Sequence, residues 1–213
     1  MSFYKHQKKQ VLARGKRLKR ENAKKAKKTA DILFPGEKWI KVEEGIYLSL
    51  RRPVGKKTNF NDELRDAQIL RDFGNIVYLA PENSRQKGRK FDAIVNDLKM
   101  EFKNMHGNGI STLQEHFFKS RSQAPNVFIN MEKSKLVKHQ AISALYGARN
   151  NEKRYSKKNA FFGGWIILKI SGQKSLIYLD VDDLKELEQK KPGARRRVGS
   201  GAVGFESHSL ADN

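Results

Sequence analysis

The sequence predicts an α/β (α+β) domain that begins near residue 60, and two patterns carry this prediction. Residues 91–103 (FDAIVNDLKMEFK) alternate between apolar and polar side chains, which is typical of strands with one face on a core. Apolar runs at 75–81 and 126–131 have the length of buried strands, and segments with helical periodicity separate them. We therefore expect four parts, with these boundaries: a basic arm at 1–30, a lead-in hairpin at 31–59, the main domain at 60–190 and a flexible tail at 191–213.

The arm carries a large share of the charge of the chain. The 213 residues include 44 Lys and Arg against 23 Asp and Glu, which leaves a net charge of +21. Residues 1–30 contain 12 Lys and Arg and one acid, Glu21, and so account for +11 of that total. We expect this segment to be helical or disordered, and to be either a solvated tail or a nucleic-acid contact.

Composition also excludes several classes of protein. There is no cysteine, so disulfides and cysteine-ligated zinc are excluded. No apolar run approaches the roughly 18–20 residues of a membrane span, and the N-terminus lacks the apolar stretch of a signal peptide. We expect a cytoplasmic site of action on a polyanion. Nucleic acid fits better than a membrane surface, because the arm has no amphipathic Trp/Phe/Leu face.

Local signals place the remaining elements. Residues 38–52 predict a small hairpin with a turn at Gly45. A helix capped by Asn61 or Asp62 is expected to end before Gly74. Ser111, with Gln114 three residues later, forms a capping-box pattern for a helix that Pro125 ends. The expected elements after it are a strand at 126–131, a helix at 135–147, a hairpin at 161–179 that turns at Ser171 and Gly172, and a short helix at 182–190.

The hairpin at 91–103 places two acids side by side. If Asn96 and Asp97 form a two-residue turn, Asp92 pairs with Glu101. One face then holds only apolar side chains: Phe91, Ala93, Val95, Leu98, Met100 and Phe102. The opposite face holds Asp92, Glu101 and Lys103, with Ile94 and Lys99 beside them. Directly opposite residues stand about 5 Å apart at Cβ, and two carboxylates there repel each other, so positive charge must compensate them.

Two sources of compensation are available to Asp92 and Glu101. Lys103 supplies one positive charge, and a divalent metal that bridges the carboxylates supplies more. Oxygen ligands suit Mg²⁺ or Mn²⁺. The alternative is that both acids are solvated and pair with nearby lysines.

The preceding helix offers a further acid. At about 100° per residue, Glu63 falls between Ala67 and Leu70 on the apolar stripe of this helix. Burying a glutamate there is costly unless it meets a cation or a hydrogen-bond donor. Glu63 is therefore a candidate for the same site, and a snorkelling acid at the helix start is the alternative.

The order of helix, three strands, helix and strand resembles the PD-(D/E)XK nuclease superfamily, whose αβββαβ core has a mixed central sheet flanked by helices. The resemblance implies a hydrolase that cleaves phosphodiester bonds. In this superfamily the acids hold a divalent metal and the lysine orients the attacking water or stabilises the phosphorus centre. Carried over, the catalytic residues are Glu63, Asp92, Glu101 and Lys103, and the metal ligands are Asp92, Glu101 and Glu63. Phe91 stands where the motif has proline.

A narrower resemblance covers residues 60–180. The segments ELRDAQILRDFG, NIVYLAP and FDAIVNDLKMEFKN resemble the C-terminal tRNase domains of contact-dependent inhibition (CdiA-type) toxins of bacteria. This resemblance implies an endonuclease that acts on RNA, tRNA above all, and an immunity or antitoxin protein that restrains it. It makes Thr112, Gln114 and Gln123 candidates for substrate contacts. The basic residues Arg89, Lys90 and Lys99 are candidates for phosphate contacts near the site.

Three other functions fit parts of the sequence. A DNA endonuclease of the resolvase or restriction type would use the same acids. A metal-free RNase would use a histidine, and His106 lies just after the hairpin. A non-enzymatic nucleic-acid-binding protein explains the charge but leaves the acids of the hairpin unexplained.

Overall fold

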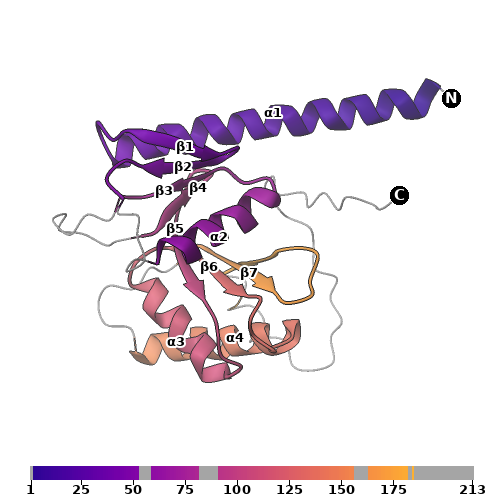
Figure 1. Ribbon diagram of the computed structural model, residues 1–213. Helices are drawn as coiled ribbons and strands as arrows, with labels where there is room; N and C mark the ends of the chain where they lie inside the picture. Colours follow the sequence, from indigo (N-terminus) through magenta and orange to yellow (C-terminus); the bar gives the residue numbers. More distant parts are fainter. Residues whose placement is uncertain (1, 53–58, 82–90, 156–162, 182–183, 185–213) are drawn as a thin grey trace. The chain divides into compact units, whose positions relative to one another are not determined.

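The computed structural model describes residues 2–52, 59–81, 91–155, 163–181 and 184 (Figure 1). The chain divides into two compact units, residues 1–102 and 103–213, and both combine helices with strands. The α+β class expected from the sequence is therefore confirmed. None of the helices in the described ranges is long and apolar enough to cross a membrane.

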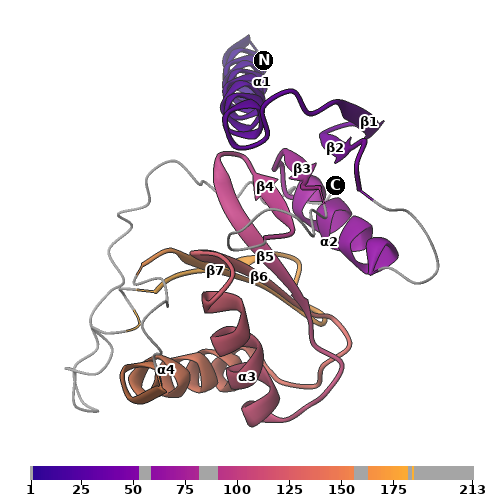
Figure 2. The same cartoon turned by 90° about the vertical axis from the view of Figure 1, so that its left-hand side faces the viewer.

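The first unit is a sheet with helices on both faces. Its elements are α1 (Ser2–Leu33), β1 (Trp39–Glu43), β2 (Ile46–Ser49), α2 (Phe60–Asp72), β3 (Val77–Leu79), β4 (Ala93–Val95) and β5 (Leu98–Asn104), which continues into the second unit. The strands lie in the order β1-β2-β3-β4-β5. The β2–β3 pair is parallel and the other described pairs of this unit are antiparallel, so the sheet is mixed. Figure 2 shows α1 and α2 on opposite faces of it.

Helix α1 contains the basic arm, and small residues seat it on the sheet. Ala26 and Ala30 are fully buried against Tyr78 and Ile94. Their short side chains let the helix backbone approach the strands closely, while the lysines around them remain at the surface. The arm is therefore helical, which was one of the two conformations expected.

The central hairpin follows the predicted turn. Val95 pairs with Leu98, and Ala93 pairs with Met100, which is the register expected for a turn at Asn96 and Asp97. Asn96 has a φ of 58°, and its side chain accepts from the N–H of Ile76 at 3.0 Å. Asparagine tolerates this left-handed conformation better than other side chains that carry a Cβ. Ala93, Val95, Met100 and Phe102 are buried, as predicted for the apolar face.

The register departs from the prediction at Asp92. The N–H of Asp92 donates to the carbonyl of Met100 at 3.0 Å, although Met100 is the cross-strand partner of Ala93. Two successive residues thus face one residue of β5, as in a β-bulge, and a bulge shifts the alternation of side chains by one. The placement of Phe91 on the apolar face with Ala93 is therefore wrong. Its ring packs instead with the Ile94 cluster beneath α1. The predicted pairing of Asp92 directly opposite Glu101 is wrong for the same reason, and the carboxylate of Asp92 instead accepts from the N–H of Phe102.

The predicted caps of two helices are also wrong. Helix α2 begins at Phe60 after Asn59, ahead of both Asn61 and Asp62, and its N-cap makes no side-chain hydrogen bond. Helix α3 (Ile110–Arg121) has Gly109 as its N-cap, so Ser111 and Gln114 form no capping box. The prediction that the first helix ends before Gly74 is confirmed, and Gly74 has a φ of 84°.

The second unit is a three-stranded sheet covered by two helices. Besides α3 it contains β6 (Asn126–Met131), α4 (Lys138–Tyr155), β7 (Trp165–Ile170) and β8 (Ile177–Asp180). Strand β6 pairs in parallel with β7, which pairs antiparallel with β8. Phe117 of α3 and Leu145 of α4 are fully buried against alternate residues of β6.

The strand at 126–131 and the turn at Gly172 are confirmed, whereas α4 starts later and ends later than predicted. The helix predicted at 182–190 lies outside the described residues except for Leu184, and the tail at 191–213 lies outside them entirely.

Gly164 supplies a test of the packing in this unit. Its φ is 115°, and a Cβ there would lie 2.8 Å from the carbonyl carbon of Pro125. Backbone cannot yield as a flexible side chain does, so Gly164→Ala is expected to lower the free energy of unfolding by more than about 1 kcal/mol. Urea unfolding in a Trp39→Phe background, which leaves Trp165 as the reporter in this unit, measures the loss. Gly172→Ala is the control, because it has a φ of 72° but no atom within 4 Å of the added Cβ. Equal losses of unfolding free energy in the two variants would show that the positive φ alone, without the contact to Pro125, destabilises Gly164→Ala.

Candidate functional site

The backbone of Asp92 is held between two strands. Its carbonyl accepts from the N–H of Ala80 at 2.9 Å, and its N–H donates to Met100 as described above. The side chain is half-buried, and its Oδ2 accepts from the N–H of Phe102 at 2.8 Å. This hydrogen bond fixes the carboxylate of Asp92 against β5, at the residue that directly follows Glu101.

Glu101 is buried, with 4% of its surface exposed. Its neighbours along β5, Met100 and Phe102, are buried on the opposite side of the strand. A buried carboxylate must be compensated by a cation, a metal or several hydrogen bonds. The alternative in which both acids of the hairpin are solvated therefore does not hold for Glu101.

Lys103 follows two residues later on β5, where strand alternation gives it the same side as Glu101. It is half-buried and belongs to the second unit, because the division between the units falls between Phe102 and Lys103. Its Nζ donates to Oε1 of Gln123 at 3.4 Å. Gln123, predicted to contact substrate, thus contacts the predicted catalytic lysine.

Glu63 is buried on α2 and paired with Arg52. Arg52 is itself buried, and its Nη2 donates to Oε2 of Glu63. Its Nη1 donates to the carbonyl oxygens of Ala80 and of Asp92, the latter at 3.2 Å. The guanidinium of Arg52 therefore links the carboxylate of Glu63 to the backbone of Asp92.

Arg52 is not among the residues predicted from the sequence. Glu63 was expected to meet a cation or a hydrogen-bond donor, and Arg52 is both. However, Arg52 and Glu63 share no helix or strand, so no periodicity connects them. The only local signal was the Arg51-Arg52 pair after the first hairpin, in a chain rich in such pairs.

His116 and His106 are the two histidines of the second unit that bear on Lys103 and on metal-free chemistry. His116 is half-buried on α3, and burial lowers its pKa, with the positive charge of Lys103 adding to that effect. It is therefore neutral at pH 7, since the ordinary pKa of histidine is about 6.5. His106, the residue considered for metal-free chemistry, is exposed.

The predicted substrate contacts differ in their surroundings. Gln114 donates from Nε2 to the carbonyl of Ala144 at 3.1 Å, and so ties α3 to α4. Thr112 is half-buried in the first turn of α3. The exposed Lys99 has its Nζ 5.7 Å from the centre of the Phe91 ring. Arg89 and Lys90 lie outside the described residues.

The donor set suits a magnesium-like ion. Within the described part of the chain, no group of three or more His, Cys, Asp or Glu side chains is placed to hold a metal. Mg²⁺ does not need such a cage, because it usually keeps several waters and binds through one or two carboxylates together with substrate phosphates. Asp92 and Glu101 fit this requirement in number and chemistry. Glu63 fits it less well, because its carboxylate is already held by Arg52.

No protein-family model matches the sequence, and no curated protein matches it. Among solved structures, a chain of a CdiA-CT/CdiI toxin and immunity complex from Burkholderia pseudomallei is similar, with a TM-score of 0.39 and 15% identity. That match covers 62% of this chain and 97% of the other. At this level of likeness, the site rests on its own geometry.

Proposed function

We propose that this protein is a metal-dependent endonuclease that hydrolyses phosphodiester bonds in RNA, tRNA above all, in the manner of a toxin. The observation that carries the proposal is the hydrogen bond from the N–H of Phe102 to the carboxylate of Asp92, next to the buried Glu101. The bond brings one predicted acid to the strand that bears the other. The resemblance to CdiA-type tRNase domains, noted from the sequence, favours RNA.

The proposal gives each residue a chemical task. Asp92 and Glu101 are the ligands of one Mg²⁺ or Mn²⁺, with Glu63 as a further ligand or a group that orients water. When bound, such an ion lowers the pKa of water and neutralises charge on the phosphate. Lys103 donates hydrogen bonds to the negative charge that develops on the phosphate oxygens. Arg52 positions Asp92 through its carbonyl and holds the carboxylate of Glu63.

Lys103 and Gln123 act together on the substrate in this proposal. Gln123 accepts from Lys103 and so limits the rotamers of a long, otherwise mobile side chain. We propose that Gln123, Thr112 and Gln114 contact or support the substrate region. Arg89, Lys90 and Lys99 are proposed to hold phosphates, which gives affinity that depends on salt rather than on sequence.

Removal of metal tests the reaction class. Wild-type protein and Glu101→Ala are incubated with total RNA and with plasmid DNA, each with Mg²⁺ or with EDTA. The expected result is cleavage of RNA by wild-type protein with Mg²⁺ only. Cleavage of plasmid instead favours the DNA endonuclease, and cleavage of RNA in EDTA favours metal-free chemistry through His106. Intact substrates at protein concentrations that show binding would contradict the proposal and favour a non-enzymatic nucleic-acid-binding protein.

A toxin implies a partner that restrains it. We propose an immunity or antitoxin protein with an acidic face, because a chain of net charge +21 favours association with negative surfaces. Growth of cells that express the chain alone, compared with cells that express Glu101→Ala, tests whether restraint is needed. Equal growth of the two would contradict the toxin assignment.

A further inference from the structure

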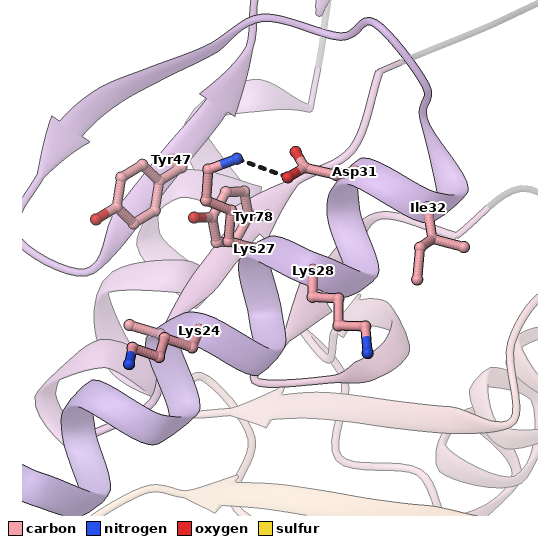
Figure 3. A pocket seen from close by; sticks show the side chains of 8 residues that line it. Lys24, Lys27, Lys28, Asp31, Ile32, Tyr47 and Tyr78 are labelled. Carbon is pink, nitrogen blue, oxygen red and sulfur yellow. Dashed lines mark hydrogen bonds and ion pairs between the residues drawn. The ribbon is translucent and has the colours of Figure 1, made fainter.

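A groove separate from the acids lies between α1 and the sheet of the first unit. It has a volume of about 640 Å³ and lies in the size range of sites that take small ligands. Helix α1 contributes Lys24, Lys27, Lys28 and Asp31, and the sheet contributes Tyr47 and Tyr78 (Figure 3). The proposed reaction uses none of these residues.

The charge of the groove is positive. Lys27 donates to Asp31 at 2.6 Å, so that pair is neutral as a unit. Lys24 and Lys28 lie one helical turn apart and form no ion pair with any residue in the described ranges. Two positive charges therefore remain at the groove for an anionic ligand. Both lysines are exposed.

The wall opposite α1 is aromatic. The rings of Tyr47 and Tyr78 are stacked, with centroids 4.5 Å apart and planes 12° from parallel. Tyr78 also packs against Trp39 in a T-shaped arrangement, with ring centroids 5.1 Å apart and planes at 86°. Tyr47 is only half-buried and is thus the ring that a ligand can reach. Burial raises the pKa of Tyr78 to about 12, so its hydroxyl stays protonated and can donate a hydrogen bond.

We propose that this groove binds a single-stranded segment of nucleic acid, with phosphates on Lys24 and Lys28 and one base or ribose against Tyr47. Lysines beside an aromatic platform are the combination with which proteins hold single strands without reading their sequence. A duplex would offer phosphates but no unstacked base for the tyrosine. The inference rests on the proposed function, because it names where the substrate of that reaction is held.

Binding without cleavage provides the test. Fluorescence anisotropy of a fluorescein-labelled single-stranded RNA dodecamer is measured in EDTA for the full chain and its variants. Lys24→Glu/Lys28→Glu is compared with Lys19→Glu/Lys25→Glu, which changes the net charge equally from α1 positions that do not line the groove. The groove variant is expected to bind about tenfold more weakly than the control, and its salt slope is expected to fall by about 1.4 for the two lost phosphate contacts. Equal weakening in both double variants would overturn the proposal, because charge alone would then explain binding.

Two further binding measurements test the contact with Tyr47 and distinguish a nucleic-acid strand from free phosphate. Tyr47→Leu is expected to weaken binding about fivefold or more if one base stacks there, and circular dichroism checks that this variant is folded. An unchanged affinity in folded Tyr47→Leu would overturn the aromatic contact.

Inorganic phosphate at the same ionic strength as a chloride control is expected to leave the complex intact. Displacement by phosphate alone would overturn the single-strand assignment in favour of a free phosphate site.

The outcome is distinguishable from failure of the proposed function. Binding that depends on the groove but leads to no cleavage with Mg²⁺ would contradict only the nuclease. Cleavage that survives Lys24→Glu/Lys28→Glu at unchanged binding would contradict only the groove.

Discussion

Asp92→Asn and Glu101→Gln are each expected to lower RNA cleavage by about 100-fold or more, because each removes a negative charge that the proposed ion requires. Both substitutions keep the shape of the side chain. The amide oxygen introduced by Asp92→Asn can still accept from the N–H of Phe102, so the local hydrogen bond is retained while the charge is lost. The measurement is the initial rate of cleavage of labelled tRNA with Mg²⁺.

A matched control lies in the same hairpin. Asp97 is exposed in the turn, and Asp97→Asn makes the same chemical change. We expect cleavage within about twofold of wild type, as for a surface substitution that touches no site. Wild-type rates for Asp92→Asn or Glu101→Gln, or an equal loss in Asp97→Asn, would contradict the roles assigned to the two acids.

Glu63→Ala is expected to lower the free energy of unfolding by about 3–5 kcal/mol, because it leaves the buried Arg52 without its carboxylate. The reverse experiment sharpens the test. Arg52→Met/Glu63→Leu removes both charges and is expected to be more stable than Glu63→Ala, since replacing a whole buried pair costs little. Urea unfolding in a Trp165→Phe background reports on this unit through Trp39.

An exposed pair is the control for this measurement. Glu115 contacts Lys119 at 2.6 Å on α3, but both side chains are more than half exposed. Glu115→Ala is expected to cost at most about 1 kcal/mol. If Glu63→Ala costs no more than this, the ion pair of Arg52 and Glu63 does not hold the site together.

Local patterns in the sequence were enough to predict the hairpin that carries the acids. Alternation and the Asn96-Asp97 turn gave the register of β4 and β5, because a slip of one residue would have exposed Ala93 and Met100. The burial of Glu63 on the apolar stripe of its helix was predictable in the same way. Each of these features depends on neighbours within one element or across one turn.

The features that could not be predicted from the sequence depend on contacts between residues that are distant along the chain. The bulge at Asp92 has no local sequence signal, and it moved Phe91 to the side of Ile94. Gln114 contacts Ala144 instead of capping its own helix, because α4 packs beside it. The link from Arg52 to Glu63 joins a loop to a helix, and the groove joins α1 to two strands. Single-sequence periodicity contains no information about such pairs.

Manganese binding tests the central claim most directly, because it does not depend on knowing the substrate. Isothermal titration with Mn²⁺ is carried out on wild-type protein, Asp92→Asn and Asp97→Asn. We expect one site in wild type and in Asp97→Asn, and an affinity at least about tenfold weaker in Asp92→Asn. Equal affinity in all three proteins, or no binding by wild type, would contradict a metal site at Asp92 and Glu101.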